Sequence, residues 1–356
     1  MLNLPNRRIS GVPGMNRIAG CLCAIALATS LQAFDTKWHM DATRIGMTQN
    51  GFSSDARLMT QFGNYITDFF SAADLQEAYK HIPGGAKAGW PTGLHGINIA
   101  DTSRLHFDAL TSQAQVEHQW ATLEANTVAA LKKWNKDPSV KPGYRGILVL
   151  TILGASLHAV QDFYSHSNWL KVAGAGAPIW FDVPAAQRQK LNVKTGWYPD
   201  GNVPGMLYHK DENKDSTGRP LNAAAFDAAS RASVDWVKRI IAQAPEIPWA
   251  TVKAWQPQPL QVAGPWLRNA DATFVTTTST LAGHWDGPTP VKNVFAVEAG
   301  RNKRMAGEAL ALSLNTYATN IAISSGATPT PFWVGFTVYH IERDLAKGLY
   351  LQNKKR

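Results

Sequence analysis

The sequence predicts a mainly α-helical fold, in which a single helical domain surrounds a buried central helix and carries long loops rich in Pro, Gly and Trp. Apolar residues recur with helical spacing in several segments, and residues 146–166 begin with a stretch that is apolar on every side. A chain of 356 residues that is 45% hydrophobic and 17% charged can bury the core of such a fold. Its composition excludes a disordered chain and a membrane protein with many spans.

The first 33 residues are typical of a secretory signal. Three arginines precede a short apolar run, residues 18–28, and small residues follow it up to Ala33. The alternative is a short buried helix at the start of the fold. We expect cleavage between Ala33 and Phe34 and a secreted or periplasmic protein, with residues 34–356 as the mature helical domain.

The predicted signal contains both cysteines of the chain, Cys21 and Cys23. The mature chain would therefore have no disulfide scaffold and no Cys-ligated zinc site. Removing three arginines with the signal lowers the formal net charge from +9 to +6. That charge forms no basic block, so nucleic acid is not the favoured partner.

Six helices are predicted from the spacing of apolar residues and from the residues that flank each segment. They cover residues 53–73, 112–134, 146–166, 223–241, 305–323 and 332–351. Ser53 or Ser54 can cap the first of them. The connections at 172–205 and 245–292 are rich in Pro and Gly, and the Thr-rich run at 273–280 suggests a short hairpin. Residues 245–356 are treated as an accessory region.

The strongest chemical signal lies at the end of the predicted central helix. His158, Asp162 and His166 follow one another at intervals of four residues and share roughly one helix face. A buried ionised aspartate requires a partner, and imidazoles that flank a carboxylate are typical zinc ligands. The alternative is a buried hydrogen-bond network without metal. We interpret the motif as a metal site.

Further potential ligands are scattered along the chain: Asp68 near the end of the first predicted helix, His106, His39 and His209. Asp68, His106 and His209 also have a structural interpretation. Asp68 would be a surface acid at a helix end, a lone His106 would be structural, and His209 would belong to a solvated polar loop.

The segment 157–169 resembles the signature of the heterokaryon-incompatibility (Het-C) proteins and their bacterial relatives. These belong to the zinc-dependent phospholipase C superfamily, which also contains zinc-dependent single-strand nucleases. Residues 63–69 resemble the Gly-Asn-Trp-Leu-Arg-Asp-Tyr segment of the family, and residues 105–108 resemble the Ser-His-Phe-Tyr-Asp segment of its phospholipases. Asn-Lys-Asp at 213–215 is similar to a Het-C pattern. The resemblance extends from about residue 34 to residue 240.

The resemblance implies a cluster of three zinc ions. Asp68, His106, His158 and Asp162 would hold one ion. Asp162 would bridge to a second ion, which His39 and the backbone amino and carbonyl groups of Phe34 would bind. His166, His209 and Asp215 would hold the third. Two departures affect that third ion: only three residues separate Asp162 from His166, and position 213 is Asn where the phospholipases and nucleases have an acidic residue.

The resemblance implies a secreted phospholipase C that hydrolyses phosphatidylcholine-type lipids to diacylglycerol and phosphocholine. A zinc-activated water would attack phosphorus, with Asp68 as its base. The expected partner is a phospholipid membrane surface, which the Trp-rich loop and the last helix would contact; loop packing is the alternative role of those tryptophans. The other functions to test are a phosphodiesterase for single-stranded nucleic acid and a non-catalytic, zinc-stabilised protein that binds a membrane or a partner.

Overall fold

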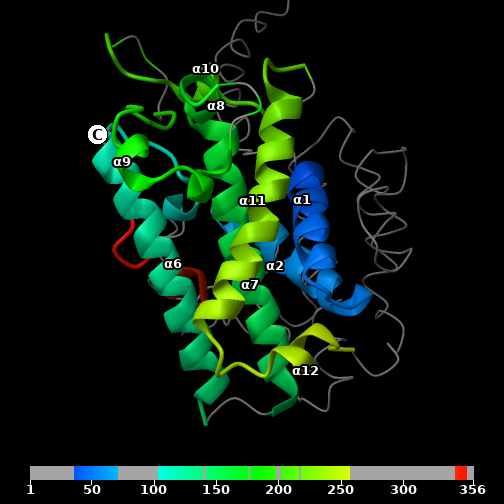
Figure 1. Cartoon of the computed structure of the whole chain (residues 1–356). Helices are drawn as coiled ribbons and strands as arrows, with labels where there is room; N and C mark the ends of the chain where they lie inside the picture. The colour runs from blue at the N-terminus through cyan, green and yellow to red at the C-terminus, as the bar shows by residue number, and fades with distance from the viewer. Residues whose placement is uncertain are drawn as a thin grey trace, which may run out of the picture. The chain divides into compact units, whose positions relative to one another are not determined.

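The computed structural model describes residues 36–70, 103–138, 142–256 (without 175, 177, 198–200, 202, 216 and 217) and 341–350. The predicted signal, Phe34, the Thr-rich hairpin and the predicted helix 305–323 lie outside these ranges. The described part is mainly helical, which confirms the predicted fold class (Figure 1). Its only β contacts are two isolated bridges, Ser167–Thr195 and Trp197–Tyr208.

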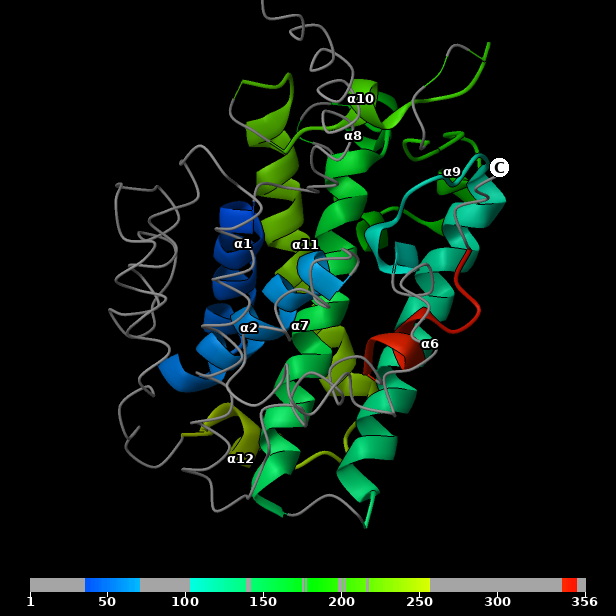
Figure 2. The same cartoon turned by 180° about the vertical axis from the view of Figure 1, so that it is seen from behind.

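Five long helices build the described core: α1 (Thr36–Gln49), α2 (Ser54–Phe70), α6 (Gln113–Lys136), α7 (Pro142–His166) and α11 (Asn222–Gln243). Short helices join them: η2 (Ser103–His106), α8 (Trp169–Val172), η3 (Trp180–Asp182), α9 (Ala185–Arg188), α10 (His209–Glu212) and α12 (Trp249–Lys253). Both views show α7 between α6 on one side and α1 and α2 on the other (Figures 1 and 2). The predicted central helix is therefore central.

Helix α7 begins at Pro142, whose fixed φ suits the first helical position. It is long and apolar enough to cross a membrane, but 94% of its apolar window is buried inside the protein. That burial is what a core helix shows, since α1, α2, α6 and α11 all pack against it.

Helix α1 was not predicted, and the reason is the composition of its buried face. His39, Asp41 and Thr43 are as buried as Met40 and Met47. Polar residues that face the interior hide the apolar stripe by which an amphipathic helix is recognised. This helix brings His39 to α7.

Helices α2 and α7 cross closely at two glycines. A Cβ on Gly154 would lie 2.2 Å from Thr60 O and 2.6 Å from Asn64 N, and a Cβ on Gly63 would lie 2.8 Å from Thr151 O. Only glycine allows the two backbones to approach this closely. The crossing places α2 against the part of α7 that carries His158.

Aromatic packing fixes the segment that follows η2. The Phe107 ring lies 5.6 Å from the Phe163 ring and 5.0 Å from the Trp120 ring, centroid to centroid. Phe163 follows Asp162 on α7, so this contact anchors the residues on either side of Phe107 close to the centre of α7.

Two of the loop tryptophans pack against the core. Trp249 Nε1 donates a hydrogen bond to Ala244 O at 2.8 Å, and the Trp255 ring occupies the space beside Gly146. For these two residues the structure favours loop packing over membrane contact. The part of the predicted membrane-contacting loop after residue 256 lies outside the described ranges, whereas residues 341–350 of the last helix lie within them.

Residues 341–350 add the end of the predicted last helix to the core. The helix ends at Ala346, whereas the sequence pattern predicts a helix as far as residue 351. Gly348, with φ +76°, lies in the turn that follows, and Asn126 Nδ2 on α6 donates to Leu345 O and Lys347 O at 2.7 Å each. The turn and this side-chain bridge replace the last helical turns.

Candidate metal centre

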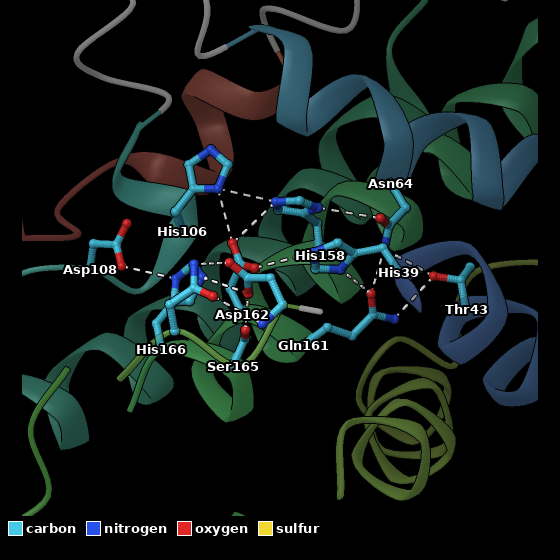
Figure 3. Close-up of polar contacts among 12 residues, drawn as sticks. His39, Thr43, Asn64, His106, Asp108, His158, Gln161, Asp162, Ser165 and His166 are labelled. Carbon is cyan, nitrogen blue, oxygen red and sulfur yellow. Dashed lines mark hydrogen bonds and ion pairs between the residues drawn. The ribbon is translucent and has the colours of Figure 1, made fainter. Parts of the chain in front are cut away.

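The buried carboxylate of Asp162 is surrounded by three imidazoles (Figure 3). Its Oδ2 lies 2.9 Å from His106 Nδ1 and 3.1 Å from His158 Nε2, and its Oδ1 lies 3.2 Å from His39 Nε2. These residues come from three separate parts of the chain: α1 supplies His39, η2 supplies His106, and α7 supplies the other two. The two carboxylate oxygens therefore face different sets of imidazoles.

Three of these atoms have the spacing of metal ligands. His158 Nε2, His106 Nδ1 and Asp162 Oδ2 lie 2.9–3.1 Å from one another. Zinc bonds of about 2.0–2.1 Å in a tetrahedron separate two ligand atoms by about 3.3 Å. His39, His158 and Asp162 form a second such set, whose ligand atoms all lie within 4.8 Å of one another.

Two amide side chains orient the imidazoles. His39 Nδ1 donates to Gln161 Oε1 at 2.7 Å, and His158 Nδ1 donates to Asn64 Oδ1 at 3.3 Å. In the neutral rings this leaves the Nε2 lone pairs directed at the carboxylate of Asp162. Lone pairs that face an anion repel it unless a cation lies between them. The donor set therefore fits a metal ion.

The amide orientation of Gln161 is itself determined by four contacts. Its Oε1 accepts from His39 Nδ1 and from Asn64 Nδ2 at 3.0 Å. Its Nε2 donates to Thr43 Oγ1 at 3.1 Å and to Ser233 Oγ at 3.0 Å. Two hydroxyls on one end and two N–H donors on the other place the oxygen toward His39.

The charge states agree with this arrangement. Burial lowers the pKa of His158 to about 3, and the nearby Asp162 opposes this only in part. Burial alone would raise the pKa of Asp162, but the imidazoles of His158, His166 and His106 hold that pKa well below its usual value. A carboxylate and a neutral imidazole meet at neutral pH, which are the forms that bind metal.

A second group lies around His166 at the end of α7. His166 Nε2 is 3.2 Å from His209 Nε2 and 3.3 Å from Asp215 Oδ1, while His166 Nδ1 is 2.9 Å from Asp108 Oδ1. All four residues are buried. Asp108, His166 and His209 also have ligand atoms within 4.8 Å of one another. This group is a second candidate metal site.

The imidazoles of the second group differ in charge. Burial opposes protonation of His166, but Asp108, Asp215 and Asp162 raise its pKa well above the usual value. Burial and the charge of His166 lower the pKa of His209 to about 4. Without a metal, His166 is thus a cation that holds the surrounding carboxylates together, and His209 is neutral.

Asp215 and Lys214 attach the loop after α10 to the end of α7. Asp215 accepts hydrogen bonds from Ser165 Oγ and Asn213 Nδ2. Lys214 Nζ donates to Ser165 O at 3.0 Å, Ser167 O at 2.8 Å and Glu212 O at 2.6 Å. A cation that binds the last carbonyls of a helix also interacts favourably with its dipole.

The structure brings together seven of the nine residues proposed as ligands. His39, His106, His158 and Asp162 form one group, and His166, His209 and Asp215 belong to the other. The solvated-loop interpretation of His209 is wrong, because the residue is 4% exposed. Asp68 lies on α2 with its side chain outside the description, and Phe34 lies outside it entirely.

Four functional side chains were missed by the sequence analysis: Asn64, Asp108, Gln161 and Lys214. Asp108 belongs to a segment that resembles a family motif, and Lys214 stands between Asn213 and Asp215. Their positions in these motifs could have identified Asp108 and Lys214 from the sequence. Asn64 and Gln161 have polar amides without any metal-ligand pattern, and only their partners reveal their role.

No protein-family model, no curated protein and no solved structure matches this chain. The fold and the site therefore define the class: a mainly α-helical protein whose central helix carries two neighbouring, buried groups of His and Asp that could hold metal ions.

Proposed function

We propose that this protein is an exported zinc-dependent phosphodiesterase of the phospholipase C type, acting on phosphatidylcholine-like lipids. The observation that carries the proposal is the position of Asp162. Its two carboxylate oxygens face different imidazoles, His106 and His158 on one side and His39 on the other. A carboxylate in that position can bridge two metal ions, as the resemblance of the central motif to the Het-C proteins implies.

Zinc suits the donor set, which consists of imidazole nitrogens and carboxylate oxygens. When bound, zinc would supply a Lewis acid for the phosphoryl oxygens and lower the pKa of a bound water molecule. The neighbouring group around His166 and His209 would hold a further ion, since Asp162 and His166 lie one helical turn apart on α7. Closely spaced metal ions favour phosphodiester hydrolysis.

The protein's own residues divide the remaining work. His39 and His158 are held by amide oxygens so that their Nε2 atoms face the reaction centre. Asp68 is the proposed base that accepts a proton from the attacking water. It follows Asn64 by one turn of α2, and Asn64 contacts His158. Helix α2 therefore supports both the metal centre and the proposed base.

The test measures metal content and turnover in the same preparations. Zinc is quantified in the wild-type protein, and p-nitrophenylphosphorylcholine, phosphatidylcholine and single-stranded DNA are assayed with Asp68→Asn, Asp162→Ala and the control Asp227→Asn. Asp227 lies on the exposed side of α11 and pairs with Arg231. We expect choline-ester turnover in the wild type and the control, and its loss in both site variants.

Other results would redirect the proposal. Cleavage of DNA alone would favour the single-strand nuclease function. Bound zinc with loss of folding on chelation, and no turnover of any substrate, would favour a non-catalytic zinc-stabilised protein that binds a membrane or a partner. A wild-type protein without zinc would overturn all three.

Export with cleavage after Ala33 is part of the proposal. Cleavage there would leave a free amino group on Phe34, five residues before His39 in the sequence. The N-terminal mass of the exported protein tests this step separately: a mature chain that begins at another residue would remove Phe34 from the proposed ligands.

A further inference from the structure

Asp108 contacts the ring nitrogen of His166 that faces away from the other ligand atoms. Asp108 Oδ1 lies 2.9 Å from His166 Nδ1 (Figure 3). His209 Nε2 and Asp215 Oδ1 lie beside the other ring nitrogen, His166 Nε2. The Asp108 side chain is buried, with 7% of the residue exposed. A carboxylate in this position can fix the orientation of the ring.

The backbone on both sides of Asp108 is strained. Phe107 has φ +51° and Ala109 has φ +60°, although neither residue is glycine. The left-handed region is unfavourable for a residue with a Cβ, because the Cβ comes too close to a backbone carbonyl oxygen. Two such residues around one aspartate indicate that the surrounding structure holds this side chain in a required place.

Hydrogen bonds connect the strained segment to the end of α7. Ala109 N donates to Gly196 O at 2.7 Å, and Leu110 N donates to Thr195 Oγ1 at 2.8 Å. Gly196 N in turn donates to His166 O at 2.9 Å. The backbone of His166 and the backbone beside Asp108 are therefore attached to the same short segment, which fixes the distance between the two side chains.

We propose that Asp108 is a positioning residue for the second metal site: its Oδ1, 2.9 Å from His166 Nδ1, keeps that nitrogen facing the carboxylate and thereby leaves Nε2 to bind the metal with His209 and Asp215. This inference rests on the proposed metal centre. Histidines that bind metals donate their other ring N–H to such partners, and losing the partner typically lowers metal affinity 10–100-fold. The surrounding structure keeps Phe107 and Ala109 at positive φ in spite of the steric cost.

Direct coordination by Asp108 is the competing arrangement. The two nitrogens of an imidazole point in different directions, so a metal bound at Nε2 lies on the opposite side of the ring from the Asp108 oxygen. Asp108 could bind the same ion as His166 only through Nδ1, which would leave Nε2 protonated toward Asp215. The two arrangements therefore predict opposite tautomers of His166.

The first experiment measures zinc affinity in the full chain. Competition with a chelator is applied to the wild type, Asp108→Asn and the control Asp235→Asn, a half-buried aspartate of α11 beside Arg239. We expect Asp108→Asn to weaken one class of zinc site about 10–100-fold while the other sites and the control keep wild-type affinity. Unchanged affinity in Asp108→Asn would overturn the inference.

The second experiment reads the tautomer of His166 in the zinc-loaded wild type, and a variant is needed only to assign the signals. Long-range ¹⁵N–¹H NMR spectra distinguish Nδ1–H from Nε2–H, and the signals of His166 are assigned by their loss in His166→Gln. A proton on Nδ1 is expected. A proton on Nε2 would show that Asp108 does not act through Nδ1.

A third variant, Ala109→Gly, separates backbone strain from orientation. Glycine adopts positive φ readily, so the variant should unfold at a higher temperature and keep the wild-type zinc affinity. Weaker zinc binding in Ala109→Gly would show that the backbone conformation beside Asp108, and not the Asp108 carboxylate alone, orients His166 for the metal. A wild type without zinc would overturn both proposals, whereas the expected zinc and NMR results without phosphodiester turnover would overturn only the proposed catalysis.

Discussion

Gln161 Oε1 accepts a hydrogen bond from His39 Nδ1 at 2.7 Å, although 122 residues of sequence separate the two side chains. This contact joins α1 to α7 and determines which nitrogen of His39 faces Asp162. The same oxygen accepts from Asn64 on α2. One buried amide therefore links three helices to the orientation of two imidazoles, and its removal should affect folding and metal binding together.

We expect Gln161→Ala to destabilise the apoprotein by about 2–4 kcal/mol, because the buried partners of its amide lose their hydrogen bonds. The variant should also bind zinc roughly 10–100-fold more weakly. Thermal unfolding in EDTA and zinc competition measure the two effects. Gln61→Ala is the matched control, since Gln61 is buried and donates to Met40 O at 3.0 Å. Similar zinc affinity in the two variants would contradict the orienting role of Gln161.

Lys214 is expected to hold the second group in place. Replacing it in Lys214→Met removes three bonds to backbone carbonyls and leaves Glu212 with fewer cations nearby. We predict a loss of about 3–5 kcal/mol, the range for breaking a buried charged pair. Urea unfolding measures it, with the exposed Lys210→Met as control. A loss below about 1 kcal/mol would show that the loop is held by other contacts.

The crossing of α2 and α7 predicts an intolerance of side chains at Gly154. In Gly154→Ala the new Cβ would meet the backbone of α2 at Thr60 and Asn64. The helices must separate, and we expect a loss of about 1–3 kcal/mol or more, together with weaker zinc binding as Asn64 moves from His158. In the control Gly218→Ala the Cβ meets no atom within 4 Å. Equal melting temperatures of the two variants would contradict this account.

Glu342 predicts a pH dependence of stability that is independent of the metal ligands. Burial raises its pKa to about 8, and the Thr67 hydroxyl opposes this only in part. Below its unfolded pKa of about 4.3, the Glu342 carboxyl group is uncharged in both the folded and the unfolded protein, so its burial does not lower the free energy of unfolding through charge. As the pH rises above that value, the free energy of unfolding should fall by up to about 1.4 kcal/mol per pH unit until the pH passes about 8.

The variant Glu342→Gln isolates this effect, because every other titrating group is common to both proteins. The difference in unfolding free energy between wild type and variant should change in favour of the variant as the pH rises from 5 to about 8. Urea unfolding of the apoprotein at several pH values provides the measurement. A difference that stays constant over this range would show that Glu342 is ionised in the folded protein.

The sequence by itself determined the helical class of the fold, the central position of α7 and the motif of His158, Asp162 and His166. These features depend on local spacing, because apolar periodicity and intervals of four residues define a helix face wherever the chain then packs. The ligand role of residues in short motifs, such as His106, came instead from the resemblance of those segments to a known family.

Only the tertiary structure decided which distant polar groups complete the site. Gln161 and Asn64 have ordinary amide side chains, and Asp108 has an ordinary carboxylate, until α1, α2 and the segment after η2 pack against α7. Helix α1 itself was missed because its buried face contains polar residues. Hydrogen bonds between groups far apart in sequence leave no periodic pattern, so the orientation of the candidate metal ligands exists only in the folded protein.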